Sequence, residues 1–74
     1  MRVDAIAANI NAATIAALAL DIARVLRQAG RALLGGFTAE DVTRLARPLE
    51  AASLLVVDRM DRVDWVCLVA RSQV

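Results

Sequence analysis

The sequence contains no histidine, no lysine and no tyrosine, and its only cysteine is Cys67. Histidine is the commonest general acid–base residue, and a nucleophile needs a base within hydrogen-bond reach. Cys67 lies in an apolar run without such a base, which is typical of a cysteine that packs as a small hydrophobic residue. One cysteine cannot form an internal disulfide, and without histidine a zinc site is out of reach. The sequence therefore predicts a chain that is not an enzyme and has no catalytic, cofactor-binding or metal-binding residues.

Carboxylates gather near the end of the chain, at Asp58, Asp61 and Asp64. Such a cluster could hold a divalent cation. However, Arg59 and Arg62 are interleaved with the carboxylates, and Asp58 precedes Arg62 by the spacing of a favourable ion pair on a helix. The pattern favours a ladder of solvated ion pairs over a metal site.

Hydrophobic residues make up 59% of the 74 positions, compared with about 45 to 50% in a typical globular domain. A lone core in a chain of about 70 to 80 residues rarely supplies more than a few kcal/mol of stability. So small a chain cannot bury this much apolar surface, and a contiguous exposed apolar patch usually marks a contact site. The composition indicates stabilisation by other subunits or by a membrane.

Gly35-Gly36 separates two long stretches in which apolar residues recur at steps of three and four. This pattern predicts an all-α fold: a two-helix hairpin, with helices over about 5–34 and 38–63, that forms a single small helical domain over 1–74 and assembles as an oligomer. The hairpin core is expected from the two apolar stripes, which form a coiled-coil-like seam. The stripes are Ile15, Leu18, Ile22, Leu26 and Leu33, facing Val42, Leu45, Leu49 and Val56.

The start of the second helix carries the strongest local pattern. Thr38 can cap the helix, Asp41 stands at its third position, and Phe37 and Val42 have the spacing of a hydrophobic staple. Pro48 lies inside the stretch and removes one backbone donor, so we expect either a kink or a helix restarted at Pro48.

The C-terminal segment has two readings, and the sequence does not decide whether residues 54–70 are helix or strand. The apolar seam continues as a helix through Val63. Alternatively, 54–57 and 63–69 are rich in branched residues and could pair as strands across a turn near Met60.

The segment from Ala5 to Leu20 carries no charge and is apolar on nearly every side of a helix. Its ordered alanines permit close approach of another helix. We expect it to form the contacts between chains together with the region around Trp65. The expected interface residues are Ala8, Ile10, Ala12, Ala16, Trp65, Val66 and Leu68. Asn9 and Asn11 are either helix-start residues facing solvent, or polar residues buried between chains that fix the register of assembly.

These patterns predict a structural protein, a subunit that self-associates into a homo-oligomer or filament or docks in a larger particle, with no small-molecule substrate. The first alternative is a membrane-associated protein that inserts its N-terminal apolar helix, although the run is shorter than the roughly 20 residues that span a bilayer. The second is a small dimeric nucleic-acid-binding regulator, which the net charge of +1 and the scarcity of aromatic residues disfavour. A cytoplasmic location is favoured.

Overall fold

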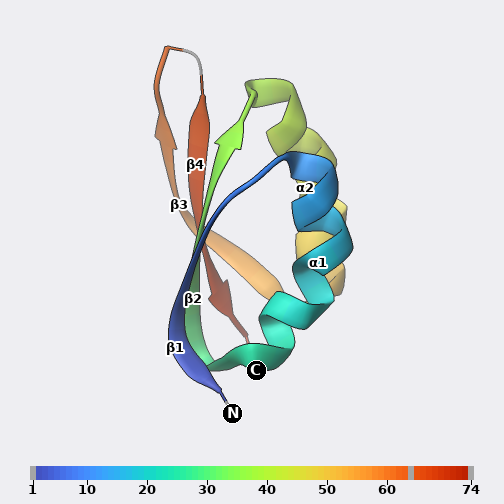
Figure 1. Ribbon diagram of the computed structural model, residues 1–74, viewed down its shortest axis with the longest axis vertical. Coiled ribbons are helices and arrows are strands. Elements are labelled where there is room, and N and C mark those ends of the chain that lie inside the picture. Colours follow the sequence, from blue (N-terminus) through green and yellow to red (C-terminus); the bar gives the residue numbers. More distant parts are fainter. Residues whose placement is uncertain (1, 64, 74) are drawn as a thin grey trace.

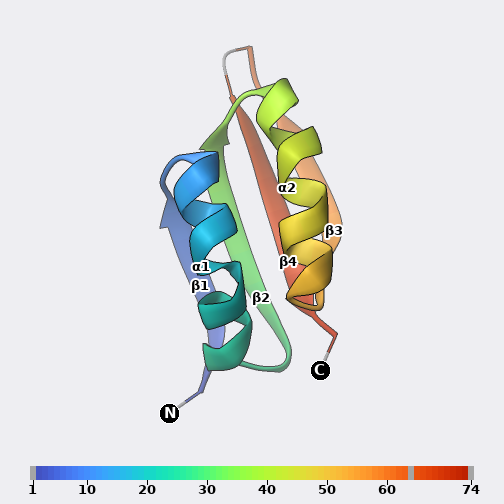
Figure 2. The same cartoon turned by 90° about the vertical axis from the view of Figure 1, so that its right-hand side faces the viewer.

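The computed structural model describes residues 2–63 and 65–73 and contains a four-stranded sheet with two helices. The elements follow in the order β1 (Val3–Asn9), α1 (Ala12–Val25), β2 (Leu26–Phe37), α2 (Ala39–Ala51), β3 (Leu54–Asp61) and β4 (Val66–Ser72). Within the sheet the strand order is β1-β2-β4-β3. The strands form one layer and both helices lie side by side over one face of it (Figure 1, Figure 2).

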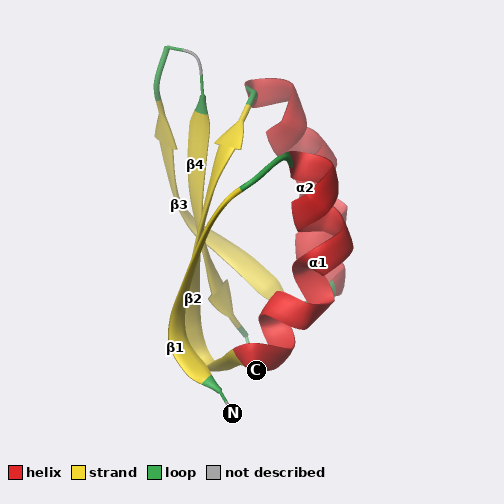
Figure 3. Cartoon of the chain, viewed as in Figure 1, coloured by secondary structure: helices red, strands yellow, loops and turns green. Residues whose placement is uncertain are grey.

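The all-α prediction is wrong, because much of both predicted helices is strand (Figure 3). β1 pairs in parallel with β2, and β2 pairs antiparallel with β4. Burial along β2 follows the period of two expected for a strand, since Ala32 and Leu34 are buried while Arg31 and Leu33 are exposed. The alanine-rich segments have helical propensity, but propensity is a weak preference that pairing with distant strands overrides.

Helix α1 is the connection that the parallel pairing of β1 and β2 requires. It occupies only the middle of the predicted first helix and begins at an N-cap, Asn11, whose side chain accepts a hydrogen bond from the backbone N–H of Thr14 at 2.8 Å. The interpretation of Asn11 as a helix-start residue is therefore confirmed. Asn9 is the last residue of β1, so it is not in a helix.

The predicted start of α2 is confirmed in detail. The backbone N–H of Asp41 donates to Thr38 Oγ1 at 3.2 Å, and the backbone N–H of Thr38 donates to Asp41 Oδ2 at 3.1 Å. This reciprocal pair is a capping box. Pro48 lies inside α2, which ends at Ala51 rather than near residue 63.

The strand alternative for the C-terminal segment is confirmed, and the coiled-coil-like seam is wrong. β3 and β4 pair antiparallel, with Leu54 opposite Ser72 and Asp61 opposite Val66. The turn lies beyond Asp61 rather than near Met60. The helical ion pair between Asp58 and Arg62 is lost with the helix, and Asp64 lies outside the described residues.

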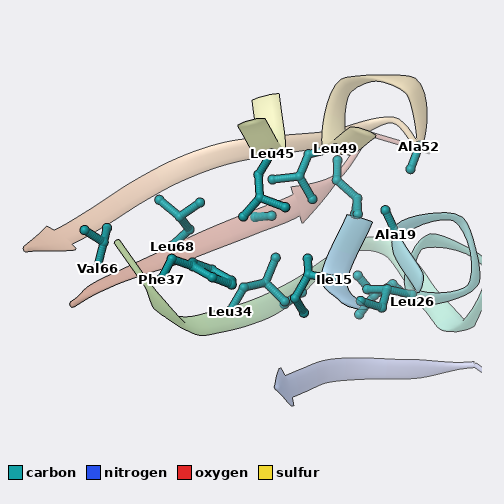
Figure 4. Close-up of a cluster of buried hydrophobic side chains, with 14 residues drawn as sticks. Ile15, Ala19, Leu26, Leu34, Phe37, Leu45, Leu49, Ala52, Val66 and Leu68 are labelled. Atoms are coloured by element: carbon teal, nitrogen blue, oxygen red, sulfur yellow. The ribbon is translucent and has the colours of Figure 1, made fainter. Parts of the chain in front are cut away.

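The core lies between the two helices and the face of the sheet that they cover (Figure 4). The cluster includes Ile15 of α1, Leu26 and Leu34 of β2, Leu45 and Leu49 of α2, and Leu68 of β4. Of the residues predicted for the hairpin core, Ile15, Ile22, Leu26, Leu45 and Leu49 are buried, Val42 packs against the core, and Leu18, Leu33 and Val56 are exposed.

Within the described ranges, neither helix has the length and apolar character needed to cross a bilayer.

Candidate functional site at the carboxyl ends of the parallel strands

The carboxyl ends of β1 and β2 lie side by side at one edge of the sheet. Asn9, the last residue of β1, is in register with Gly35, near the end of β2. In open sheets with parallel strands, ligands bind outside the carboxyl ends of the strands, where the loops diverge. A binding site is therefore expected at this edge of the sheet.

The side chain of Asn9 lies against Gly36. A Cβ atom added to Gly36 would come within 2.6 Å of Asn9 Oδ1, a distance that real Cβ contacts do not reach. The φ angle of Gly36 is +90°, a left-handed conformation that residues with a side chain rarely adopt. An irregularity in the pairing of β2 with β4 between Gly35 and Phe37 places Gly36 outside the regular ladder. Because Gly36 has no side chain, the Asn9 amide can occupy the space beside it.

The loop that follows Asn9 is fixed by Asn11. Besides the N–H of Thr14, the Thr14 hydroxyl donates to Asn11 Oδ1 at 2.9 Å. These bonds tie the start of α1 to the residue two positions after Asn9. The backbone that carries the Asn9 amide is therefore held between a paired strand and a capped helix.

A hollow of about 520 Å³ opens beside Asn9. Among the described residues, its lining consists of the Asn9 amide, apolar side chains, glycines and the Cys67 thiol. The lining residues are Ala7, Ala8, Asn9, Leu33, Gly35, Gly36, Trp65 and Cys67. Such a surface can accept a flat or apolar group, while one amide offers both a hydrogen-bond donor and an acceptor to orient it.

The charged pairs lie outside this hollow. On β3, Arg59 donates from Nε to Asp61 Oδ1 at 2.7 Å and from Nη2 to Asp61 Oδ2 at 3.0 Å. These hydrogen bonds, helped by the opposite charge, hold the pKa of Asp61 below its ordinary value. Across the part of the chain that the structure describes, no three cysteine or carboxylate side chains come together in a group that could hold a metal ion.

The structure separates the residues that were predicted to form the interface between chains. Trp65 and Ala8 line the hollow. Val66 and Leu68 are buried in the core, Ala12 and Ala16 pack against it, and Ile10 is exposed in the loop after β1. Their role in contacts between chains stays a prediction.

Sequence reasoning missed that the Asn9 side chain lies beside Gly36. Gly35-Gly36 was interpreted as the turn of a hairpin, and Asn9 as part of a helix start. The available pattern was an asparagine at the end of one apolar segment and, after a helix, a glycine pair near the end of the next apolar segment. It becomes informative only once both segments are recognised as parallel strands.

Several solved structures share this fold, among them the following two. The ribosomal protein L11 methylase from Lactobacillus delbrueckii subsp. bulgaricus matches with a TM-score of 0.88 at 22% identity, over 96% of this chain and 37% of that one. M1.HpyAVI, solved as a complex with SAM, matches with a TM-score of 0.78 at 18% identity, over 99% of this chain and 46% of that one. The present chain thus spans less than half the length of either protein. No curated protein matches the chain.

The sequence also matches a family described as ribosomal protein L11 methyltransferase (PrmA), over residues 1–73. This match overturns three predictions made from the sequence: the structural subunit, the absence of enzymatic function and the absence of a small-molecule substrate. The shortage of catalytic side chains does not exclude an enzyme, because a methyltransferase takes its reactive group from a bound donor, and the protein mainly binds and orients the reactants. The chain belongs to the ribosomal protein L11 methyltransferase family.

Proposed function

We propose that this chain forms one part of a methyltransferase domain that transfers a methyl group from S-adenosylmethionine (SAM) to a ribosomal protein of the L11 type. The observation that carries the proposal is the family match over residues 1–73. The site geometry supports it, because the hollow beside Asn9 lies at the carboxyl ends of parallel strands. A cytoplasmic location belongs to the same proposal, since a ribosomal protein would be met there.

The residues around the hollow fit one wall of a site for the methyl donor and its acceptor. SAM, when bound, supplies a methyl group on a positively charged sulfur. The apolar lining would exclude water, and the Trp65 ring offers a face that attracts cations. Among the described residues, the lining contains no carboxylate that could bind the hydroxyl groups of the donor. This chain therefore contributes one part of the proposed site.

Asn9 has the clearest part in this proposal. Its amide oxygen can accept a hydrogen bond from an N–H or O–H group of the protein substrate and so orient the nucleophilic atom. Its position is set by the end of β1 on one side and by Gly36 on the other. A side chain fixed in this way loses little conformational entropy when the substrate binds.

The experiment is a hybrid enzyme in which this chain replaces the segment of the Lactobacillus methylase that it matches. We expect the hybrid to transfer labelled methyl groups from SAM to purified L11. Asn9→Ala should lower this activity about ten- to a hundredfold, as expected for loss of one orienting hydrogen bond. Gln28→Ala, at an exposed position away from the hollow, is the matched control and should leave activity unchanged.

A folded hybrid that binds SAM but leaves L11 unlabelled would contradict the proposed activity. A hybrid whose Asn9→Ala variant methylates L11 as fast as its parent would instead remove Asn9 from the site.

A further inference from the structure

Strand β3 forms one edge of the sheet, and its outer side is free. β3 is the last strand in the order β1-β2-β4-β3, and among the described residues it pairs with β4. The end of the β3–β4 hairpin stands clear of the two helices (Figure 1). An edge strand presents a row of unpaired backbone N–H and C=O groups, to which a strand of another chain can pair.

Two hydrogen bonds show which backbone groups point away from β4. The Arg62 N–H donates to the Trp65 carbonyl oxygen at 2.8 Å across the hairpin. Because the direction of the backbone groups alternates along a strand, those of Asp61 and Arg59 point to the free edge. The Arg59 N–H agrees with this, since it donates to the neighbouring Asp58 Oδ1 at 2.8 Å. The free edge therefore offers pairing groups at positions 59 and 61.

The charges at this edge complement a second copy of the same segment. Residues 58–62 read Asp-Arg-Met-Asp-Arg. If two copies run antiparallel with Met60 opposite Met60, Arg59 lies opposite Asp61 of the second copy. In the same register, Asp58 lies opposite Arg62 of the second copy. The two-fold symmetry repeats both pairs, so every charge in the segment faces an opposite charge.

The neighbouring registers are disfavoured by like charges. A slip of one residue in one direction places Asp58 opposite Asp61 of the second copy, and in the other direction it places Arg59 opposite Arg62 of the second copy. A slip of two residues places Arg59 or Asp61 opposite itself. Like charges directly opposite each other destabilise an antiparallel pair. Charges on an edge usually block pairing, but this order of charges admits one partner in one register.

The side chains of the segment are available for such contacts. Arg59 Nε lies 2.7 Å from Asp61 Oδ1 of its own chain, and the two side chains are 43% and 56% exposed. A carboxylate has lone pairs for a second guanidinium, so this pair can remain while a pair between copies forms. Met60 is 43% exposed and would become covered at the centre of the contact.

We propose that two copies of this chain associate through antiparallel pairing of β3, with Met60 at the two-fold axis, and so join their sheets into one. Arg59 and Asp61 of the second copy then exchange backbone hydrogen bonds, and the Asp58 carboxylate leaves the Arg59 N–H to pair with Arg62 of the second copy. Trp65 lies across the hairpin from Arg62 and lines the hollow, so the interface borders the candidate site. The proposal concerns assembly and does not depend on methyl transfer.

The first test is light scattering after size exclusion over a range of concentrations of the chain. The parent should form a dimer. Arg62→Asp places like charges opposite each other at two symmetric positions and should raise the dissociation constant of the dimer at least about tenfold. Adding Asp58→Arg restores opposite charges in the reverse order and should recover the dimer. Arg47→Asp, at an exposed position on α2, is the matched control and should leave the constant unchanged.

The second test examines the register. Met60 would face its own copy in a non-hydrogen-bonded pair, where Cα atoms are about 4.5 Å apart and a disulfide can form. Met60→Cys should therefore yield a covalent dimer under mild oxidation, and adding Arg62→Asp should slow its formation. Arg47→Cys is the control for random collision.

The outcomes separate this interface from other modes of association. A monomeric parent would overturn the proposal. A dimer or larger species that Arg62→Asp leaves unchanged would also overturn it, since another surface would then hold the copies together. If the Asp58→Arg, Arg62→Asp chain folds by circular dichroism but stays monomeric, the pairing of charges across the edge is wrong.

Discussion

Asn9 Oδ1 lies 2.6 Å from the point at which Gly36 would carry a Cβ atom. The two residues come from the ends of neighbouring parallel strands, so the contact joins β1 and β2 at the edge where the candidate site opens. Glycine is required there for two separate reasons, the contact with Asn9 and the φ angle of +90°.

Gly36→Ala should therefore destabilise the chain and displace the Asn9 side chain. The left-handed backbone alone costs about 1 to 3 kcal/mol for a residue with a side chain. Urea unfolding followed by circular dichroism measures the loss. Gly35→Ala is the control, because its Cβ would meet Cys67 Sγ at 3.7 Å, an ordinary contact. Similar losses for both variants would contradict the special role of Gly36.

Leu34 and Leu33 are neighbours in sequence on opposite faces of the sheet. Leu34 is fully buried against the helices, whereas Leu33 is 44% exposed. Leu34→Ala should cost about 2 to 5 kcal/mol of unfolding free energy, enough to unfold so small a chain. Leu33→Ala should cost less than about 1 kcal/mol in the isolated chain. If the order of the two losses were reversed, the assignment of the core to the helix-covered face would fail.

The capping box at the start of α2 allows the loss of stability from removing its hydroxyl group to be predicted. Thr38→Ala removes the acceptor for the Asp41 N–H and should cost about 1 kcal/mol. Thr43→Ala changes the same residue type at an exposed position inside α2 and should fall within about 0.5 kcal/mol of the parent. Thermal unfolding of the two variants distinguishes the cap from a general effect of losing a hydroxyl.

The ion pair between Arg59 and Asp61 predicts that the stability of the fold depends slightly on pH. The folded-state pKa of Asp61 lies below its ordinary value, because Arg59 donates hydrogen bonds to it. Its contribution to stability is therefore present above the unfolded pKa of about 4 and is lost as the pH falls through the lower folded value. Carboxyl NMR titration should show the Asp61 pKa rising in Arg59→Gln. Arg62→Gln should leave it unchanged, and a shift of equal size there would mean that general charge, and not this pair, sets the pKa.

The helix-capping patterns were predictable because the interactions that produce them are local. Thr38 and Asp41 are three residues apart and satisfy each other's backbone N–H groups whatever the rest of the chain does. The strands were harder. Residues 26–37 contain apolar residues at helical steps as well as at alternate positions, and both periods fit a short apolar segment.

The candidate site was not predictable from the residues themselves. Asn9, Gly36 and Trp65 are far apart in sequence and carry no motif of fixed spacing. The prediction of a chain without enzymatic function failed for a related reason: a protein that binds and orients a group donor does not need histidine, lysine or tyrosine for the reaction itself.

The sequence by itself determined where α2 begins and that apolar surface would remain exposed, because these depend on neighbouring residues or on composition alone. Tertiary structure alone decided that Val3–Asn9 and Leu26–Phe37 are strands. A strand satisfies its backbone hydrogen bonds only through a partner, and each partner here lies far along the chain. The same pairing placed the Asn9 side chain beside Gly36, and so created the candidate site.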